Sequence, residues 1–235
     1  MRRGIYMKKV INPRLMLIVS MTIFGTLGIF VRNIPVSSGE LALYRAILAA
    51  LLIAVYLIIT KQRISFTKIK KEVPLLLLSG IAMGVNWILL FEAYKYTTVS
   101  LATLSYYFAP VIVTVVCPVL FHERLTGKQI LCFIMSTIGL VMITGIGDIG
   151  SGSDFIGILF GLGAAVFYAT VILLNKFIKN VEGIPRTFLQ FLSAIVILIP
   201  YVMLSGGMSL GGMNAVGWIN LLIVGLVHTG VTYCM

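Results

Sequence analysis

The stretch "VPLLLLSGIAMGVNWILLFEAY", residues 73–94, decides the fold of this chain. It is 22 residues long and carries one charged side chain, Glu92, near its end. A helix needs about 20 mainly apolar residues, each rising about 1.5 Å, to cross the hydrocarbon core of a bilayer. Because hydrocarbon offers no partners to backbone polar groups, such a segment pairs them internally as a helix. The stretch therefore predicts a transmembrane helix.

Apolar stretches of spanning length recur along the chain. We expect eight of them, at Leu15–Val31, Leu41–Thr60, Val73–Tyr94, Ser100–Phe121, Gln129–Gly145, Phe155–Phe177, Pro185–Leu204 and Val216–Met235. Of the 235 residues, 60% are hydrophobic and 11% are charged, with a mean hydropathy of +1.08. Soluble domains average about 25% charged residues, so most of this surface must face lipid. The expected fold class is an all-α polytopic membrane protein in a lipid bilayer, without a separate soluble domain.

The Lys and Arg residues are concentrated in alternate loops along the chain. Of the 18 Lys and Arg residues, 15 fall on the side of the amino terminus, and only Arg32 and Lys95 fall in loops of the other side. Cytoplasmic loops accumulate such residues, so residues 1–14 are expected to form a basic cytoplasmic segment. The net charge of +11 then reflects topology, and no nucleic-acid partner is expected. The start also resembles a secretory signal, but the lack of a small-x-small cleavage site favours an uncleaved first helix.

An internal repeat is visible in the apolar stretches. Sliding the chain by 146 positions places residues 75–89 over residues 221–235, so that Trp87 meets Tyr233. The repeat divides the chain into a first unit of five helices, residues 15–145, and an incomplete second unit, residues 155–235. Five helices leave the chain on the opposite side, so a second copy is inverted, as in many transporters with a midplane site. We expect a truncation after helix eight that omits helices nine and ten; the alternative is a natural eight-helix protein.

Several motifs carry a resemblance to a known family. They are "IFGTLGIFVR" (residues 23–32), "GELALYRAILAALL" (39–52), "FEAYKYTTVSLATLSYYFAPVIVTVVCPVLFHERLTGKQ" (91–129) and "GLGAAVFYATVILLNKFIK" (161–179). The most specific piece is a proline after aromatic residues, followed by Glu-Arg-Leu-Thr. The chain resembles the EamA-type transporters of the drug/metabolite transporter superfamily. The resemblance implies a ten-helix carrier of two inverted five-helix units that exports small metabolites or amino acids.

Polar and aromatic side chains inside the apolar stretches are the candidates for a substrate cavity. They are Arg45, Asn86, Trp87, Tyr106, Tyr107, Tyr168 and His228. Ionisable residues within a membrane are commonly functional, and aromatic rings with hydroxyl groups suit a pocket for apolar or amino-acid side chains. Pro110 is expected to bend the fourth helix beside the paired tyrosines.

Each candidate has a structural alternative. Arg45 either reaches back to the interface or lines a cavity and contacts an anion. The Asn86 amide either bonds a neighbouring helix or faces a substrate. Successive residues of a helix point about 100° apart, so only one of Tyr106 and Tyr107 is expected to face inward. His228 is either a neutral, hydrogen-bonded imidazole or a group that helps to couple protons.

Charged pairs occur near two helix ends. Glu92 and Lys95 are three residues apart on one helix face. They form either an interfacial salt bridge or a site where Glu92 takes up a proton during export. Glu123 and Arg124 are expected to mark the boundary between the fourth and fifth helices, and gating by this pair is the alternative.

The function classes narrow to two. Signatures such as GxSxG, HExxH and phosphate-binding loops are missing from the sequence, so no enzyme activity, cofactor or metal site is expected. The first class is a secondary carrier that exports a small metabolite such as an amino acid, alternating access to a midplane cavity. The second is a membrane-embedded non-transporter, such as a sensor, an assembly partner or an inactive fragment. The expected location is the plasma or bacterial inner membrane, and the sequence is compatible with a homodimer.

Overall fold

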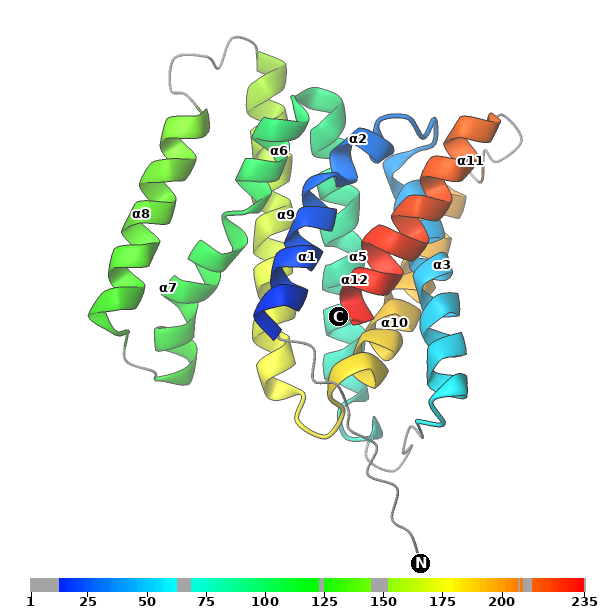
Figure 1. Cartoon of the computed structure of the whole chain (residues 1–235), viewed down its shortest axis with the longest axis horizontal. Helices are drawn as coiled ribbons and strands as arrows, with labels where there is room; N and C mark the ends of the chain where they lie inside the picture. Colours follow the sequence, from blue (N-terminus) through cyan, green and yellow to red (C-terminus); the bar gives the residue numbers. More distant parts are fainter. Residues whose placement is uncertain are drawn as a thin grey trace, which may run out of the picture.

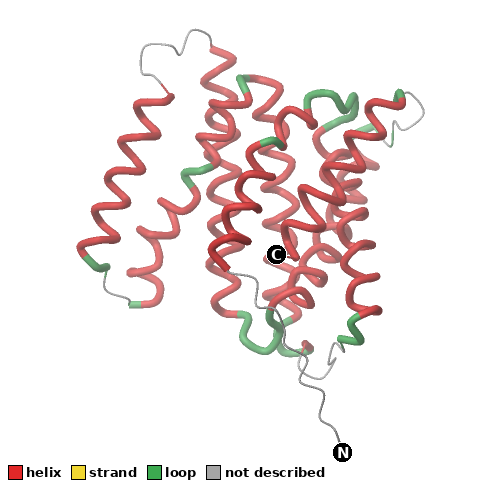
Figure 2. Tube along the Cα trace, in the orientation of Figure 1, coloured by secondary structure: helices red, strands yellow, loops and turns green. Residues whose placement is uncertain are grey.

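Helices form all the regular secondary structure in the part of the chain that the structure describes. This computed structural model describes residues 13–62, 69–122, 125–144, 152–206, 208 and 213–234. The described loops between helices are short (Figure 2). The helices are α1 (Pro13–Gly25), α2 (Leu27–Val31), α3 (Ser38–Ile59), α5 (Val73–Tyr96), α6 (Val99–Tyr106), α7 (Ala109–Phe121), α8 (Gly127–Thr144), α9 (Gly152–Phe177), α10 (Gly183–Leu204), α11 (Ala215–Leu222), η2 (Ile223–Val231) and α12 (Thr232–Cys234).

Seven segments of the described chain are long and apolar enough to cross a bilayer. Helices α1 and α2 together form one of them, as do α6 with α7, and α11 with η2 and α12. Helix α8 adds a further apolar helix of 18 residues. The expected all-α polytopic membrane fold is therefore confirmed.

Three of the eight expected helices are interrupted. The first breaks at Thr26, the fourth breaks at Tyr107 and Phe108, and the last contains a nine-residue π-helix, η2. Hydrophobic patterning does not register these breaks, because the residues on both sides of each break are equally apolar.

The two units of the repeat run in opposite directions through the bundle. Helix α1 starts at the lower end of Figure 1, whereas α9, its counterpart in the second unit, starts at the upper end. The pairs α3 and α10, and α5 and α11, are opposed in the same way. Opposed counterparts are the arrangement that an inverted repeat requires.

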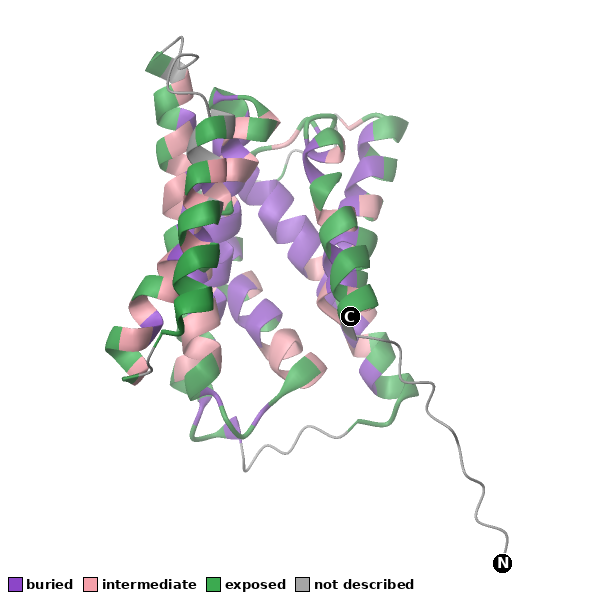
Figure 3. Ribbon diagram, turned by 60° about the vertical axis from the view of Figure 1, so that its left-hand side comes forward, coloured by how far each residue is buried: buried purple, intermediate pink, exposed green. Residues whose placement is uncertain are grey.

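Many exposed positions of the bundle are apolar. The buried positions lie between the helices (Figure 3). Among the exposed aliphatic side chains are Leu204 at 89%, Val119 at 77% and Ile58 at 75%. Large apolar surfaces of this kind are unfavourable in water and suit the hydrocarbon core. The protein is therefore a multi-pass membrane protein.

Small residues allow the helix backbones to approach closely. A Cβ atom added to Gly80 of α5 would lie 2.7 Å from the backbone oxygen of Gln190 in α10. A Cβ added to Gly161 of α9 would lie 2.7 Å from the Cβ of Ser105 in α6. At Gly84, by contrast, the nearest atom would be a side-chain carbon at an ordinary 3.5 Å.

Hydrogen bonds join the two units at both ends of the bundle. At the lower end, Oε1 of Glu72 accepts from the backbone N–H of Lys179 at 2.8 Å. The same oxygen accepts from both the backbone N–H and the side-chain amide of Asn180 at 2.9 Å. At the upper end, the hydroxyl of Thr97 donates to the carboxylate of Asp154 at 2.7 Å. We call these two sets of hydrogen bonds the polar crossings. The interior between them holds the candidate site.

Candidate functional site

An aromatic cavity of about 230 Å³ lies among α1, α2, α3, α5, α6, α7, α9 and α12. Arg45 is the one charged residue among the described residues that line it. Its volume is below the range of roughly 300–1,000 Å³ that is typical of sites for drug-sized ligands, so it suits a small metabolite. The aromatic side chains of its wall are Phe24, Trp87, Tyr106, Tyr107, Tyr168 and Tyr233.

The interruption between α6 and α7 forms one wall of this cavity. Helix α6 ends at Tyr106, and Pro110 lies in the first turn of α7. A proline has no N–H to donate to the carbonyl four residues earlier, and its ring crowds that turn. Tyr107 therefore lies in the break rather than on a continuing helix, and both tyrosines line the cavity. Tyr107 is 42% exposed, whereas Tyr106 is half-buried.

Arg45 is held inside the bundle rather than reaching back to the interface. Its residue is 1% exposed, and its guanidinium carbon lies 4.5 Å from the ring centre of Trp87 and 5.2 Å from that of Phe91. Cation–π contacts of this kind stabilise a desolvated cation. Its Nε donates to the hydroxyl of Thr229 at 3.1 Å. Its Nη1 is buried and has no hydrogen-bond partner in the described part of the chain.

The π-helix η2 presents Thr229 to Arg45. Backbone bonds in a π-helix run to the fifth residue along, and short π segments are frequent at functional sites. The hydroxyl of Thr229 donates to the carbonyl of Val224 at 2.8 Å, so its lone pairs can accept from Arg45. The same segment leads into α12, where Tyr233 lines the cavity. We call Arg45 and Thr229 the Arg45 cluster.

Two sequence candidates do not line the cavity, because hydrogen bonds turn them toward neighbouring helices. The amide of Asn86 in α5 donates to the backbone oxygen of Ala164 in α9 at 2.6 Å. A ring nitrogen of His228, Nε2, lies 2.9 Å from the hydroxyl of Thr26, and the other lies 3.3 Å from the backbone oxygen of Ile223. Asn86 thus joins the two units, and His228 joins η2 to the break between α1 and α2.

The charged pairs from the sequence lie away from the cavity or outside the described residues. Nζ of Lys95 lies 2.9 Å from Oε1 of Glu92, and the two side chains are 49% and 26% exposed. The geometry is that of an interfacial salt bridge at the upper end of α5. Glu123 and Arg124 lie outside the described residues.

A second buried polar group, the Gln190 cluster, consists of Gln190, Ser79 and Asn175. Nε2 of Gln190 in α10 donates to the hydroxyl of Ser79 in α5 at 2.5 Å and to the side-chain oxygen of Asn175 in α9 at 2.7 Å. In this cluster the structure leaves no buried side-chain atom of the described residues without a partner. Its bonds tie three helices together.

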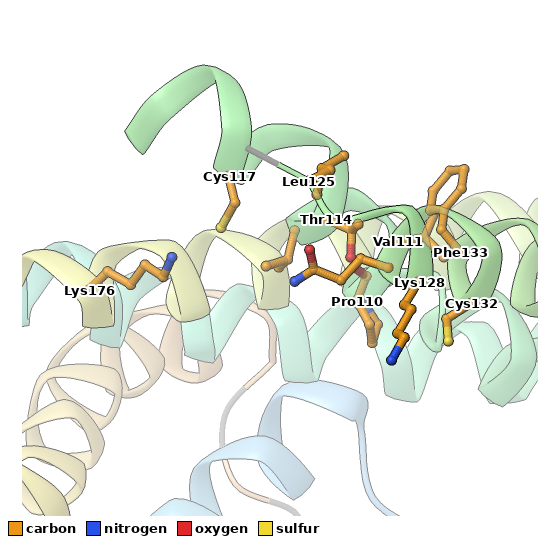
Figure 4. Close-up of a pocket in the computed structure, with 11 residues that line it drawn as sticks. Pro110, Val111, Thr114, Cys117, Leu125, Lys128, Cys132, Phe133 and Lys176 are labelled. Atoms are coloured by element: carbon orange, nitrogen blue, oxygen red, sulfur yellow. The ribbon is translucent and has the colours of Figure 1, made fainter. Parts of the chain in front are cut away.

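A larger hollow of about 510 Å³ lies between α7, α8 and α9. Its walls include Lys128 and Lys176, which lie far apart across the hollow in Figure 4 and do not converge on one point. The lining residues Lys128, Leu125 and Cys132 are exposed on the outside of the bundle. This hollow is therefore an outward-facing groove, and the aromatic cavity is the better candidate site.

Inverted helical units that surround a buried, largely aromatic cavity define the general class of membrane transporters built from repeats. The profile of the EamA-like transporter family matches residues 13–145 and 155–235. This chain belongs to the EamA-like transporter family, within the drug/metabolite transporter superfamily, and the resemblance seen in the sequence is confirmed.

Relatives support this assignment. The chain is 30% identical over 221 residues to the "Uncharacterized transporter YxxF" of Bacillus subtilis (strain 168), covering 93% of this chain and 70% of that protein. A protein of known crystal structure superposes with a TM-score of 0.73 at 14% identity, covering 94% of this chain and 76% of the other. That likeness shows a shared fold.

Tyr233, Phe24 and Thr229 belong to the candidate site but were not among the sequence candidates. Tyr233 carried a signal, because the repeat aligned it with Trp87, and both rings line the cavity. Nothing in the sequence marked Phe24 or Thr229 as a site residue, because phenylalanine and threonine are ordinary residues in a membrane helix.

Proposed function

We propose that this protein is a secondary active transporter that exports small metabolites such as amino acids. The observation that carries the proposal is the small aromatic cavity with one buried arginine, enclosed by helices of both inverted units. A site between inverted units is open to one side at a time when the units rock against each other. The membership of the EamA-like family and the relative named as a transporter support this function.

Alternating access gives a role to the polar crossings at the two ends of the bundle. Opening at the lower end requires the loop of Lys179 and Asn180 to leave Glu72. Opening at the upper end requires Thr97 to leave Asp154. In this proposal the cavity exchanges with one side when one crossing opens while the other stays closed.

The transport function is tested by counterflow in proteoliposomes. Vesicles containing the full chain are loaded with an unlabelled solute, and entry of the labelled solute is measured for neutral amino acids, organic acids, organic amines and sugars. Exchange above that of protein-free vesicles supports the proposal. No exchange of any solute, with or without pH and sodium gradients, overturns it.

We further propose that the protein lies in a plasma or bacterial inner membrane with its amino terminus in the cytoplasm. The charge distribution supports this orientation. After replacement of the three native cysteines, a single cysteine at Lys61 should resist a membrane-impermeant maleimide in intact cells, and one at Lys95 should react. The opposite result overturns the orientation but leaves the transport function standing.

A further inference from the structure

We infer that Arg45 binds the carboxylate of an organic monoanion whose apolar body lies against the aromatic walls of the cavity. The inference rests on the proposed transport function and names the substrate class for that site. It commits to a carboxylate as the charged group that is recognised, with no requirement for an amino group.

The first step is the unfinished hydrogen bonding of Arg45. A guanidinium has five N–H donors in a planar fork. In the described structure Nε is used by Thr229, and Nη1 is buried without a partner. No described carboxylate forms an ion pair with Arg45. A buried cation without a counter-charge is unfavourable, and a carboxylate matches the fork with two parallel bonds.

The second step is the rigid placement of the guanidinium. Trp87 and Phe91 hold it from their ring faces, and Thr229 holds its Nε. Arg45 and Trp87 both line the cavity. A preorganised donor loses little conformational entropy when an anion arrives, so the charge and the aromatic wall act together on one ligand.

The third step is the charge of the rest of the wall. Apart from Arg45, the described residues that line the cavity are uncharged, and most are apolar or aromatic. Nothing in this wall offers a carboxylate to an ammonium group, and an ammonium near Arg45 would meet repulsion. An apolar monocarboxylate therefore suits the cavity better than a zwitterion, an amide or an amine.

Binding is tested with a set of probes that share one ring and differ in charge. The chain has two tryptophans, Trp87 in the cavity wall and Trp218 on α11. A Trp218→Phe protein in nanodiscs reports on the cavity through Trp87 fluorescence. The probes are 3-phenylpropionate, L-phenylalanine, 3-phenylpropanamide and 2-phenylethylamine.

We expect 3-phenylpropionate to bind most tightly, with an advantage of about tenfold or more over the amide, since that factor corresponds to one strong charge-assisted contact. Phenylalanine should be intermediate, and the amine weakest. Arg45→Gln should abolish the advantage of the acid over the amide, and Arg45→Lys should retain only part of it. The control Arg32→Gln removes a charge outside the cavity and should leave the order unchanged.

Several outcomes overturn the inference: equal binding of acid and amide, preference for the amine or the zwitterion, or no response to any of the four probes. The comparison of the four probes in the Trp218→Phe protein needs no Arg45 variant, so it stands even if that variant does not fold. Counterflow with the same probes separates the two proposals. Binding of the acid without exchange overturns transport alone, whereas exchange without preference for the acid overturns the inference alone.

Discussion

The Gln190 cluster and the Arg45 cluster are both polar groups buried among apolar helices, but they differ in how completely they are bonded. Gln190 donates to Ser79 and to Asn175, and the structure leaves none of the buried atoms of these three side chains unpaired. Arg45 keeps a buried donor without a partner and lies on a cavity wall. The difference teaches that a completed polar group holds helices together, whereas an incomplete one beside a cavity is available to a ligand.

The largest effect is expected from Gly80→Ala, which wedges α5 and α10 apart beside the Gln190 cluster. The added Cβ would lie 2.7 Å from the backbone oxygen of Gln190, and overpacking of this kind costs about 2 kcal/mol. Thermal unfolding in detergent measures the loss. Gly84→Ala is the matched control, because its Cβ would meet a carbon at 3.5 Å. Equal melting temperatures for the two variants would contradict the close approach.

The next effect is expected from Gln190→Leu, which removes the donor of the completed cluster. Ser79 and Asn175 then lose their partner, at a cost of about 1 kcal/mol. Stability should fall while the substrate affinity of the folded protein stays within about twofold, because the cluster lies outside the cavity wall. Ser193→Ala in the same helix is the control, because that hydroxyl donates to the backbone oxygen of Leu189 in the preceding turn of α10. If Gln190→Leu lowered the substrate affinity and Ser193→Ala did not, the claim that the Gln190 cluster only holds helices together would be contradicted.

Thr229→Val should show the reverse pattern in the Arg45 cluster. The change keeps the side-chain shape but removes the acceptor of Arg45 Nε, so the guanidinium loses its fixed orientation. We expect the apparent affinity in counterflow to fall about fivefold, roughly the 1 kcal/mol of one hydrogen bond. Thr170→Val is the control, since its hydroxyl bonds to Val166 within α9. An unchanged affinity would show that Thr229 does not position Arg45.

The smallest effect is expected from Glu92→Gln, which breaks the exposed pair with Lys95. Exposed pairs contribute about 0.3 kcal/mol, so the melting temperature should barely change. The pH profile of transport should also remain that of the wild type, because this pair lies outside the cavity. Lys95→Gln should behave in the same way. If Glu92→Gln lost the pH dependence and Lys95→Gln kept it, the hypothesis that Glu92 takes up a proton during transport would be supported.

Most of the fold could be predicted from the sequence, because length and apolarity dictate helices in a bilayer. The odd number of helices in the repeat also predicted the opposed directions of the two units. The local breaks at Thr26 and Tyr107, and the π-helix, depend on backbone geometry within uniformly apolar runs. Only Pro110 gave a sequence signal for one of them.

The candidate site was harder to predict at the level of single residues. Trp87 lines the cavity while the adjacent Asn86 bonds Ala164, because neighbouring residues of a helix point about 100° apart. The rotation of each helix about its own axis is set by packing between helices distant in sequence. His228 illustrates this, since its partner Thr26 lies 202 positions away.

The π-helix η2 has a consequence for the aromatic ring of α12, the short helix that continues it. A π segment accommodates one surplus residue compared with an α-helix of similar length. Deleting one residue from Ile223–Val231 would therefore relax the segment to α-helical winding and leave α12 facing the same way. The backbone that presents Thr229 to Arg45 would change, whereas Tyr233 would stay on the cavity wall. A one-residue deletion in η2 thus separates the contribution of Thr229 from that of the ring on α12.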